Sequence, residues 1–172
     1  MRPEGQKERA LNLSQKEIVM AQQVRPGSAR NTISLKLHLP KCTPQTVKTA
    51  ADKVFMSADI FSACLCKTDQ RGTWHMAYGK QPCVCSVCEA YTLTQAQNRM
   101  ERLDRAAMDM EKQPCDALVM PLAEGGSYLY VRFHHAIIDG YGMSLFVQKV
   151  MDTIEGRAVE KSVFDVQARE DG

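Results

Sequence analysis

Hydrophobic residues recur at two spacings along this chain, and the alternation between them predicts where strands and helices follow one another. Residues 31–39 alternate, with Ile33, Leu35, Leu37 and Leu39 on one side, which predicts a half-buried strand. After Thr43 and Pro44, apolar residues recur at helical spacing: Val47, Ala50, Ala51, Val54, Phe55 and Ala58. This predicts an amphipathic helix with Thr43 as its N-cap and Pro44 as its first residue.

Two further helices are predicted from capping-box patterns, in which Ser or Thr is followed three residues later by Glu or Gln. Ser14 and Glu17 mark the first of them, which Pro26-Gly27 ends. Thr94 and Gln97 mark the second, with Met100, Leu103, Ala107 and Met110 as its buried stripe. A last helix is predicted over about residues 141–155, because Met143, Phe146, Val147, Val150, Met151 and Ile154 form one apolar face.

Short strands are predicted at residues 60–67, 73–78, 82–88, 117–122 and 127–135. The last two flank Glu124-Gly125-Gly126, a tight hairpin turn. The order is helix, strand, helix, strands, helix, hairpin, helix. It predicts an α/β fold built as a two-layer sandwich.

Composition excludes several classes of function. The chain has 172 residues, 44% of them hydrophobic and 24% charged, which suits one globular domain. The net charge of +2 is scattered, which argues against nucleic-acid binding. No apolar run reaches the roughly 18 residues of a membrane span, and residues 1–10 lack the apolar core of a signal peptide. We therefore expect a cytoplasmic protein.

Seven cysteines are present, an odd number with no secretory context, so we expect no disulfide framework. Cys83-x-Cys85-x-x-Cys88 resembles a metal-binding spacing at first sight, and Cys64 and Cys66 share a strand-like segment. The alternation around Cys83 and Cys85 suits a strand whose small apolar side chains face a core. We predict buried thiols and no metal site.

The segment richest in chemistry is His134-His135-x-x-x-Asp139-Gly140, at the end of an apolar strand and before the last helix. Because strand side chains alternate, His135 should share the core-facing side with Leu129, Val131 and Phe133, and His134 should face the other way. Burial favours a neutral imidazole, which can take a proton from an attacking amine, hydroxyl or thiol. His135 is therefore the predicted base.

Asp139 has two possible roles that the sequence leaves open. It could fix the loop that orients His135, or it could cap the last helix, since Asp is a favoured N-cap. Gly140 could let a substrate pass close to the backbone, or it could simply form a tight turn.

This segment resembles the signature of the chloramphenicol acetyltransferase-like superfamily, and within it a nonribosomal peptide synthetase condensation domain. Residues Leu13-Ser14-Gln15-Lys16-Glu17, Arg25-Pro26-Gly27-Ser28 and Asn31 are similar to the first motif of that family. Gln113-Pro114-Cys115-Asp116 resembles a later motif. The resemblance implies an N-terminal lobe over residues 11–156, with a mixed sheet and helices on one face. Residues 1–10 and 158–172 are expected to be flexible tails.

The resemblance also implies a function. Such domains join a carrier-tethered acyl or peptidyl thioester to a carrier-tethered amine, forming an amide. Two 4'-phosphopantetheine arms enter a tunnel between two lobes, so the partners are carrier proteins and a C-terminal lobe of the same synthetase or another copy. The implied catalytic residues are His135, Asp139, Gly140 and His134, with His135 as base or positioning group and Asp139 as a structural residue. No directly bound cofactor is implied.

The chain also departs from the family pattern. The family's second motif carries an arginine that pairs with the aspartate, and residues 59–64 contain none. Arg25, Arg30 or Arg132 could replace it. Because a tunnel needs two walls, the isolated lobe is expected to be inactive. Two alternatives remain: a self-contained coenzyme A-dependent acyltransferase with its site between subunits, and a non-catalytic lobe that docks carrier proteins.

Overall fold

The computed structural model describes residues 8–68, 72–79 and 81–159. Its elements are, in order, β1 (Glu8–Ala10), α1 (Leu13–Val24), β2 (Thr32–Leu39), α2 (Pro44–Met56), the 3₁₀ helix η1 (Asp59–Ser62), β3 (Cys64–Thr68), β4 (Thr73–Ala77), β5 (Ser86–Val87), α3 (Leu93–Asp104), β6 (Cys115–Pro121), β7 (Ser127–His134) and α4 (Gly140–Ile154). Among these described elements, no helix has both the length and the hydropathy needed to cross a bilayer.

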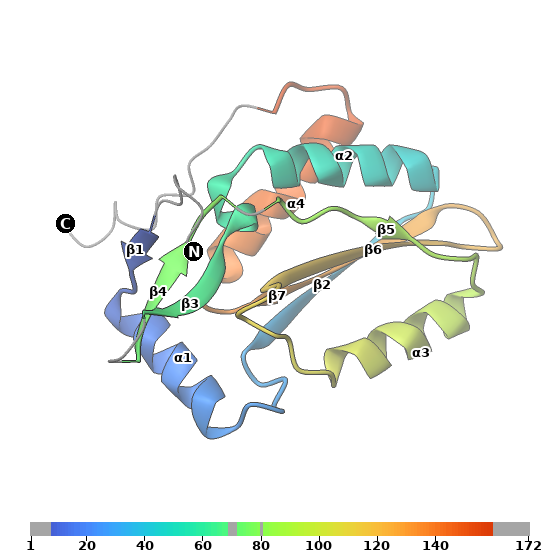
Figure 1. Cartoon of the computed structure of the whole chain (residues 1–172). Helices are drawn as coiled ribbons and strands as arrows, with labels where there is room; N and C mark the ends of the chain where they lie inside the picture. The colour runs from blue at the N-terminus through green and yellow to red at the C-terminus, as the bar shows by residue number, and fades with distance from the viewer. Residues whose placement is uncertain (1–7, 69–71, 80, 160–172) are drawn as a thin grey trace.

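The strands form two sheets (Figure 1). The larger has the order β2-β7-β6-β5, antiparallel throughout except for β5, which runs parallel to β6. The smaller has the order β1-β4-β3 and is antiparallel. The larger sheet is therefore mixed, and β7 is one of its two central strands.

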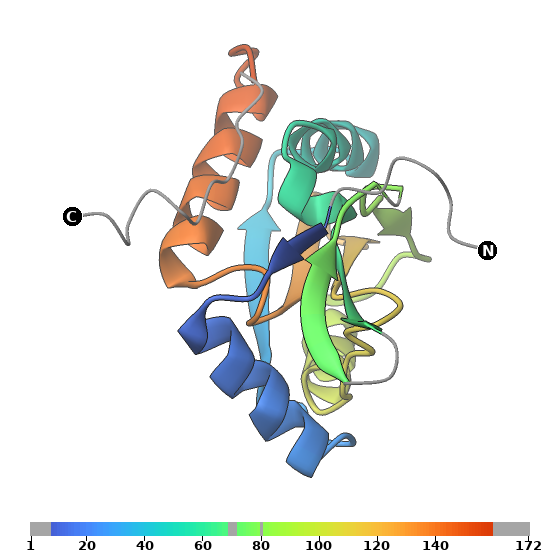
Figure 2. The same cartoon turned by 60° about the vertical axis from the view of Figure 1, so that its left-hand side comes forward.

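Helices cover both faces of the larger sheet. Helices α2 and α4 pack against each other on one side, and α3 lies on the opposite side against β2 and β7 (Figures 1 and 2). Beneath α3 is a second apolar cluster made of Ala96, Met100, Met120, Leu122 and Tyr130. The predicted α/β lobe with a mixed sheet is confirmed. Helices α2 and α4 form the predicted second layer on one face of the larger sheet. Helix α3 adds a third layer on the opposite face, which was not predicted.

The main core lies between the sheet and the pair α2 and α4. Its centre is a group of four aromatic rings, from Phe55, Phe61, Phe133 and Phe146, with ring centroids 5.0 to 5.8 Å apart. Edge-to-face and tilted contacts of this kind add to the stabilisation from buried apolar area. Because Phe146 belongs to α4 and Phe133 to β7, this group fixes the helix relative to the strand that precedes it.

A network of polar contacts around the buried Arg132 attaches α3 to the opposite face of the larger sheet. The guanidinium of Arg132 on β7 donates to the carbonyls of Leu103 and Ala106, at 2.6 and 3.0 Å, and pairs with Asp116 on β6. A cation beside the last carbonyls of a helix is favourable electrostatically. The Tyr130 hydroxyl donates to Asp104 at the end of α3, at 2.7 Å. Arg132 is thus a structural residue of this face.

Most predicted elements are present, but both predicted capping boxes are displaced. Helix α1 is capped by Asn12 with Gln15, and α3 by Thr92 with Gln95, each two residues before the predicted cap. Each helix has two residues that can serve as its N-cap, Asn12 or Ser14 in α1 and Thr92 or Thr94 in α3. In both, the residue nearer the N-terminus is the cap. Thr43 caps α2 as predicted. The strand predicted at 60–67 begins only at Cys64, because residues 59–62 form η1.

The prediction for the termini is partly wrong. Residues 8–10, expected in a flexible tail, form β1 and pair with β4. The rest of that tail, residues 1–7, and residues 160–172 lie outside the described part of the chain. At the hairpin, Gly125 and Gly126 have φ of 101° and 78°, as the predicted tight turn requires.

The prediction of buried thiols is confirmed for Cys83 and Cys85, which are 5% and 3% exposed and belong to the main core. The strand predicted there is reduced to Ser86–Val87. The backbone N–H of Cys85 instead bonds to the Asp52 carboxylate on α2, at 2.7 Å. Burial raises the pKa of the Cys85 thiol, so it remains protonated.

Candidate active site

The histidine segment lies at the junction of β7 and α4. Strand β7 ends at His134 and α4 starts after Asp139, so residues 135–138 form the connecting turn. The N–H of Ile137 bonds to the carbonyl of His134 at 3.0 Å, which closes the turn. The N–H of His135 bonds to the carbonyl of Asn31 at 2.7 Å, which ties the turn to the chain just before β2.

His134 is the buried histidine of the pair. It is 1% exposed, and its Nδ1 accepts a hydrogen bond of 3.3 Å from the N–H of Ala136. This bond places the ring proton on Nε2, which is buried and has no partner in the described part of the chain. Burial, with a smaller effect from His135, lowers the pKa of His134 to about 4. The ring is therefore neutral at physiological pH and fixed in one tautomer.

His135 is exposed, so the prediction that it would point inward with the core is wrong for this chain. The physical reason is that the strand ends at His134, and side-chain alternation does not continue into a turn. Both faces of β7 are also covered, by α2 and α4 on one side and α3 on the other. A side chain on either face of β7 can be buried, so strand alternation could not predict which of the two histidines is buried. His135 presents its ring on the surface of the described lobe.

Asp139 is the N-cap of α4. Its Oδ1 accepts a hydrogen bond of 2.8 Å from the N–H of Gly142, so the capping role that the sequence left open is confirmed. None of the three arginines considered as its partner pairs with Asp139 within the described residues. Arg132 binds Asp116 instead. The carboxylate of Asp139 instead lies at the N-terminus of α4, where the helix dipole favours negative charge.

The two glycines after Asp139 have different surroundings. A methyl group at Gly140 would meet no atom within 4 Å, so this position borders open space. A methyl group at Gly142 would lie 2.6 Å from Cγ1 of Ile138, so this glycine lets the turn fold closely onto α4. Space beside the backbone at Gly140 is what a passing substrate would need.

The structure also brings the first motif to this turn. The side chain of Gln15 on α1 donates to the carbonyl of Ala136 at 2.9 Å. Asn31, whose carbonyl holds His135, donates its side-chain amide to Gln22 and to the carbonyl of Ile18 on α1. Sequence reasoning gave Gln15 no role at the site. Gln15 could have been considered because it lies in the Leu-Ser motif, and that motif and the histidine segment resemble the same family pattern.

Replacing Asp139 with alanine is expected to destabilise the protein by about 1 kcal/mol, because an N-cap acceptor is lost. Asp139→Asn keeps the acceptor and is expected to change the free energy of unfolding by only a few tenths of a kcal/mol. Urea denaturation of both variants measures the difference. Equal losses for the two variants would show that the charge of Asp139, and not its cap, stabilises the turn.

The low pKa of His134 predicts a pH-dependent stability. In the unfolded chain this imidazole binds a proton near pH 6.5, whereas in the folded protein it does so only near pH 4. The unfolded state binds more protons between these values, so the free energy of unfolding falls as the pH is lowered through this window, by up to about 1.4 kcal/mol per pH unit. Above pH 6.5 the effect is absent.

Urea denaturation across pH 4 to 7 measures this dependence. The matched control is His134→Asn, whose side-chain oxygen can accept the Ala136 N–H but does not titrate. Subtracting its profile removes the contribution of the carboxylates common to both proteins. Identical profiles for the two proteins would contradict the prediction.

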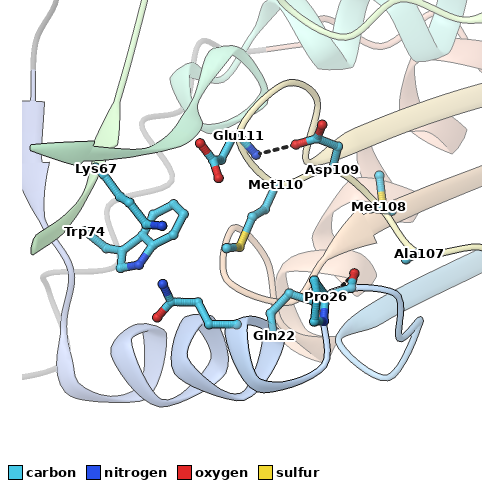
Figure 3. A pocket seen from close by; sticks show the side chains of 10 residues that line it. Gln22, Pro26, Lys67, Trp74, Ala107, Met108, Asp109, Met110 and Glu111 are labelled. Atoms are coloured by element: carbon cyan, nitrogen blue, oxygen red, sulfur yellow. Dashed lines mark hydrogen bonds between the residues drawn. The ribbon is translucent and has the colours of Figure 1, made fainter. Parts of the chain in front are cut away.

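A separate pocket of about 490 Å³ lies between the end of α1, the β3 and β4 strands and residues 107–111 (Figure 3). In it the ammonium of Lys67 lies 4.8 Å from the centre of the Trp74 ring. The lining residues are Gln22, Gln23, Pro26, Lys67, Trp74, Ala107, Met108, Asp109, Met110 and Glu111. None of the four predicted catalytic residues is among them, so the histidine site is not part of this pocket.

Comparison with known proteins shows the family of this chain. The family model described as "Condensation domain" matches residues 5–165, which is most of the chain. No curated protein sequence is similar enough to count as a match. The chain belongs to the condensation domain family.

Solved structures show the same fold. The starter condensation domain of the rhizomide synthetase RzmA is similar with a TM-score of 0.75 at 23% identity, over 88% of this chain and 39% of that one. The first condensation domain of the calcium-dependent antibiotic synthetase, in complex with a substrate analogue, is similar with a TM-score of 0.76 at 19% identity, over 92% of this chain and 40% of that one. The chain therefore spans about two fifths of these structures, and it fits an N-terminal lobe.

Proposed function

We propose that this chain is the catalytic-histidine lobe of a condensation domain that forms an amide from a carrier-tethered thioester and a carrier-tethered amine. The observation that supports this most directly is the presentation of His135. Its ring is exposed at the β7–α4 turn, while the backbone behind it is held by Asn31, Gln15 and the Asp139 cap. A base must be reachable by its substrate yet fixed in position.

The proposed chemistry is general-base catalysis of aminolysis. The amine nitrogen attacks the thioester carbon, and the imidazole of His135 accepts the proton that the nitrogen loses. The carbon–sulfur bond then breaks, and the sulfur leaves as a thiol after taking up a proton. In this proposal the substrate passes beside Gly140, which borders open space. Positioned bases contribute roughly 10²–10⁴-fold to such reactions.

His134 and Asp139 are positioning residues in this proposal. Neutral His134 accepts the Ala136 N–H and so shapes the turn without placing a second positive charge beside His135. Asp139 fixes the other end of the turn to α4. Neither needs to touch the substrate.

The proposed partners follow from the exposure of His135. A second surface must face it to exclude water and form a channel, because electrostatic effects weaken in an open, hydrated site. That surface would be a C-terminal lobe of the same synthetase or another copy. Acyl and peptidyl carrier proteins would deliver the two substrates on 4'-phosphopantetheine arms.

The test is reconstitution of amide formation. The complete condensation domain that contains this chain is mixed with a donor carrier loaded with an acyl thioester and an acceptor carrier loaded with an aminoacyl group, and the product is measured by mass spectrometry. We expect amide product from the complete domain and none from the 172-residue chain alone. Acetyl transfer from acetyl-coenzyme A by a stable trimer of the chain would instead support the self-contained acyltransferase.

A further inference from the structure

The turn of residues 135–138 is held by two hydrogen bonds from other parts of the chain, and both lead to α1. The carbonyl of Ala136, the residue after His135, accepts a bond of 2.9 Å from the side-chain amide of Gln15. The N–H of His135 donates to the carbonyl of Asn31 at 2.7 Å. The side-chain amide of Asn31 in turn donates to Gln22 on α1, at 3.1 Å. Helix α1 therefore reaches this turn by one direct and one indirect route.

These bonds fix successive peptide groups around His135. The peptide group before His135 is held through its N–H, and the one after Ala136 is held through its carbonyl. Between them, the N–H of Ala136 donates to the buried ring of His134 at 3.3 Å, a long bond. Because each peptide group is planar, the direction of the His135 side chain follows from the planes around it. Losing the Gln15 bond would leave two of these planes less firmly held.

Both ends of the Gln15 amide are used. The N–H of Asn12 donates to its Oε1 at 3.1 Å, which completes the capping box of α1, while its Nε2 donates to Ala136. The oxygen therefore serves the helix and the nitrogen serves the turn. A carboxylate could replace the oxygen, since Glu is as suitable as Gln in a capping box, but an ionised carboxylate has no hydrogen to donate. An amide satisfies both partners, whereas a carboxylate satisfies one.

We propose that Gln15 is a positioning residue for amide formation, which holds the turn so that the ring of His135 meets the attacking amine. This inference rests on the proposed function, because it concerns the base that this function names. Gln15 acts through the backbone of Ala136 and needs no contact with the substrate. Misplacing a catalytic group by about 1 Å can cost about 100-fold in rate, so losing this bond should lower kcat at least about tenfold.

Gln15→Glu in the complete condensation domain tests this role. The variant keeps the acceptor for Asn12 and adds a negative charge where the dipole of α1 favours it, so the helix should stay folded. Its carboxylate cannot donate to Ala136. With carrier-loaded substrates we expect kcat to fall and KM to stay nearly unchanged. A wild-type kcat, or an effect on KM alone, would overturn the proposal.

Gln95→Glu is the matched control. Gln95 completes the capping box of α3 with the same kind of bond, from the N–H of Thr92 at 2.9 Å, but it is exposed and lies on the face of the larger sheet opposite to α4. This variant should keep the wild-type rate. Equal losses in Gln15→Glu and Gln95→Glu would show that a new charge in a capping box, and not the turn, causes the effect.

A second variant, Gln15→Met, removes both polar ends of the side chain, keeps its length and adds no charge. It should also lower kcat, because the bond to Ala136 is lost. A wild-type rate in Gln15→Met would assign any loss in Gln15→Glu to the introduced charge and would overturn the proposal.

NMR of the His135 ring gives a readout that does not depend on activity. With isotope-labelled histidine, the ring Cε1 signal of His135 in the complete domain is identified by its loss in His135→Ala. It should shift or broaden in both Gln15 variants and stay unchanged in Gln95→Glu. An unchanged signal in the Gln15 variants would overturn this inference, while amide formation by the wild-type domain would still support the proposed function. A shifted signal in a domain that forms no amide would contradict the proposed function and support the positioning by Gln15.

Discussion

Replacing His135 with alanine is expected to lower the rate of amide formation by the complete condensation domain about 100-fold or more. The reason is that the variant lacks the only group that the proposed mechanism uses to take the proton from the attacking amine. The side chain is exposed and its backbone is held independently by Asn31, so folding should be unaffected. Steady-state kinetics with carrier-loaded substrates measure the effect, which should fall on kcat and leave KM nearly unchanged.

The matched control is His38→Ala. His38 is also an exposed histidine on this lobe, stacked on the ring of Tyr128 with centroids 4.7 Å apart, and it lies on β2 away from the turn. This variant should retain the wild-type rate. If His135→Ala also retained it, the base assignment would be wrong, and the non-catalytic docking role would be favoured.

Truncating Phe146 to alanine is expected to destabilise the protein by about 3–5 kcal/mol, the usual cost of removing a buried aromatic side chain. Phe146 is fully buried and contacts the rings of Phe55, Phe61 and Phe133, which join α4 to α2, η1 and β7. The remaining cavity cannot be filled by its rigid aromatic neighbours. Urea denaturation should show a lower midpoint with little change in slope.

Gln148→Ala is the control on the same helix. Gln148 is exposed, and alanine is a better helix former, so its effect should stay within about 0.5 kcal/mol. A loss below about 1 kcal/mol for Phe146→Ala would mean that α4 is not anchored by the aromatic group. Because α4 begins directly after Asp139, a strong loss at Phe146 should also lower activity by loosening the His135 turn.

The two histidines show how far the sequence predicts the site. The motif and its position between a strand and a helix were predictable, because strand and helix each have their own apolar period. The assignment of the buried ring was wrong, because it extended strand alternation by one residue past His134, the last residue of β7. The backbone there is held by the carbonyls of Pro114 and Asn31, which come from distant parts of the chain.

Arg132 and α3 are a second case in which the sequence alone led to a wrong prediction. The sequence offered Arg132 as a partner for Asp139, only seven residues away, and placed the helices on one face of the sheet. In the structure Arg132 pairs with Asp116 and with carbonyls at the end of α3, on the face opposite to α4. A side chain that points away from one helix cannot serve it, however close in sequence. Which face of the sheet Arg132 points to, and which helix covers that face, could be learned only from the structure.

Local structure was predictable from the sequence: the periods of β2, α2 and α4, the cap at Thr43, the glycine turn at residues 125–126 and the histidine motif. These depend on neighbouring residues, whose spacing is written along the chain. Three features became known only from the folded structure: which histidine is exposed, what Asp139 and Arg132 bind, and that Gln15 supports the turn. Those outcomes depend on groups that are far apart in sequence and are brought into contact only by packing.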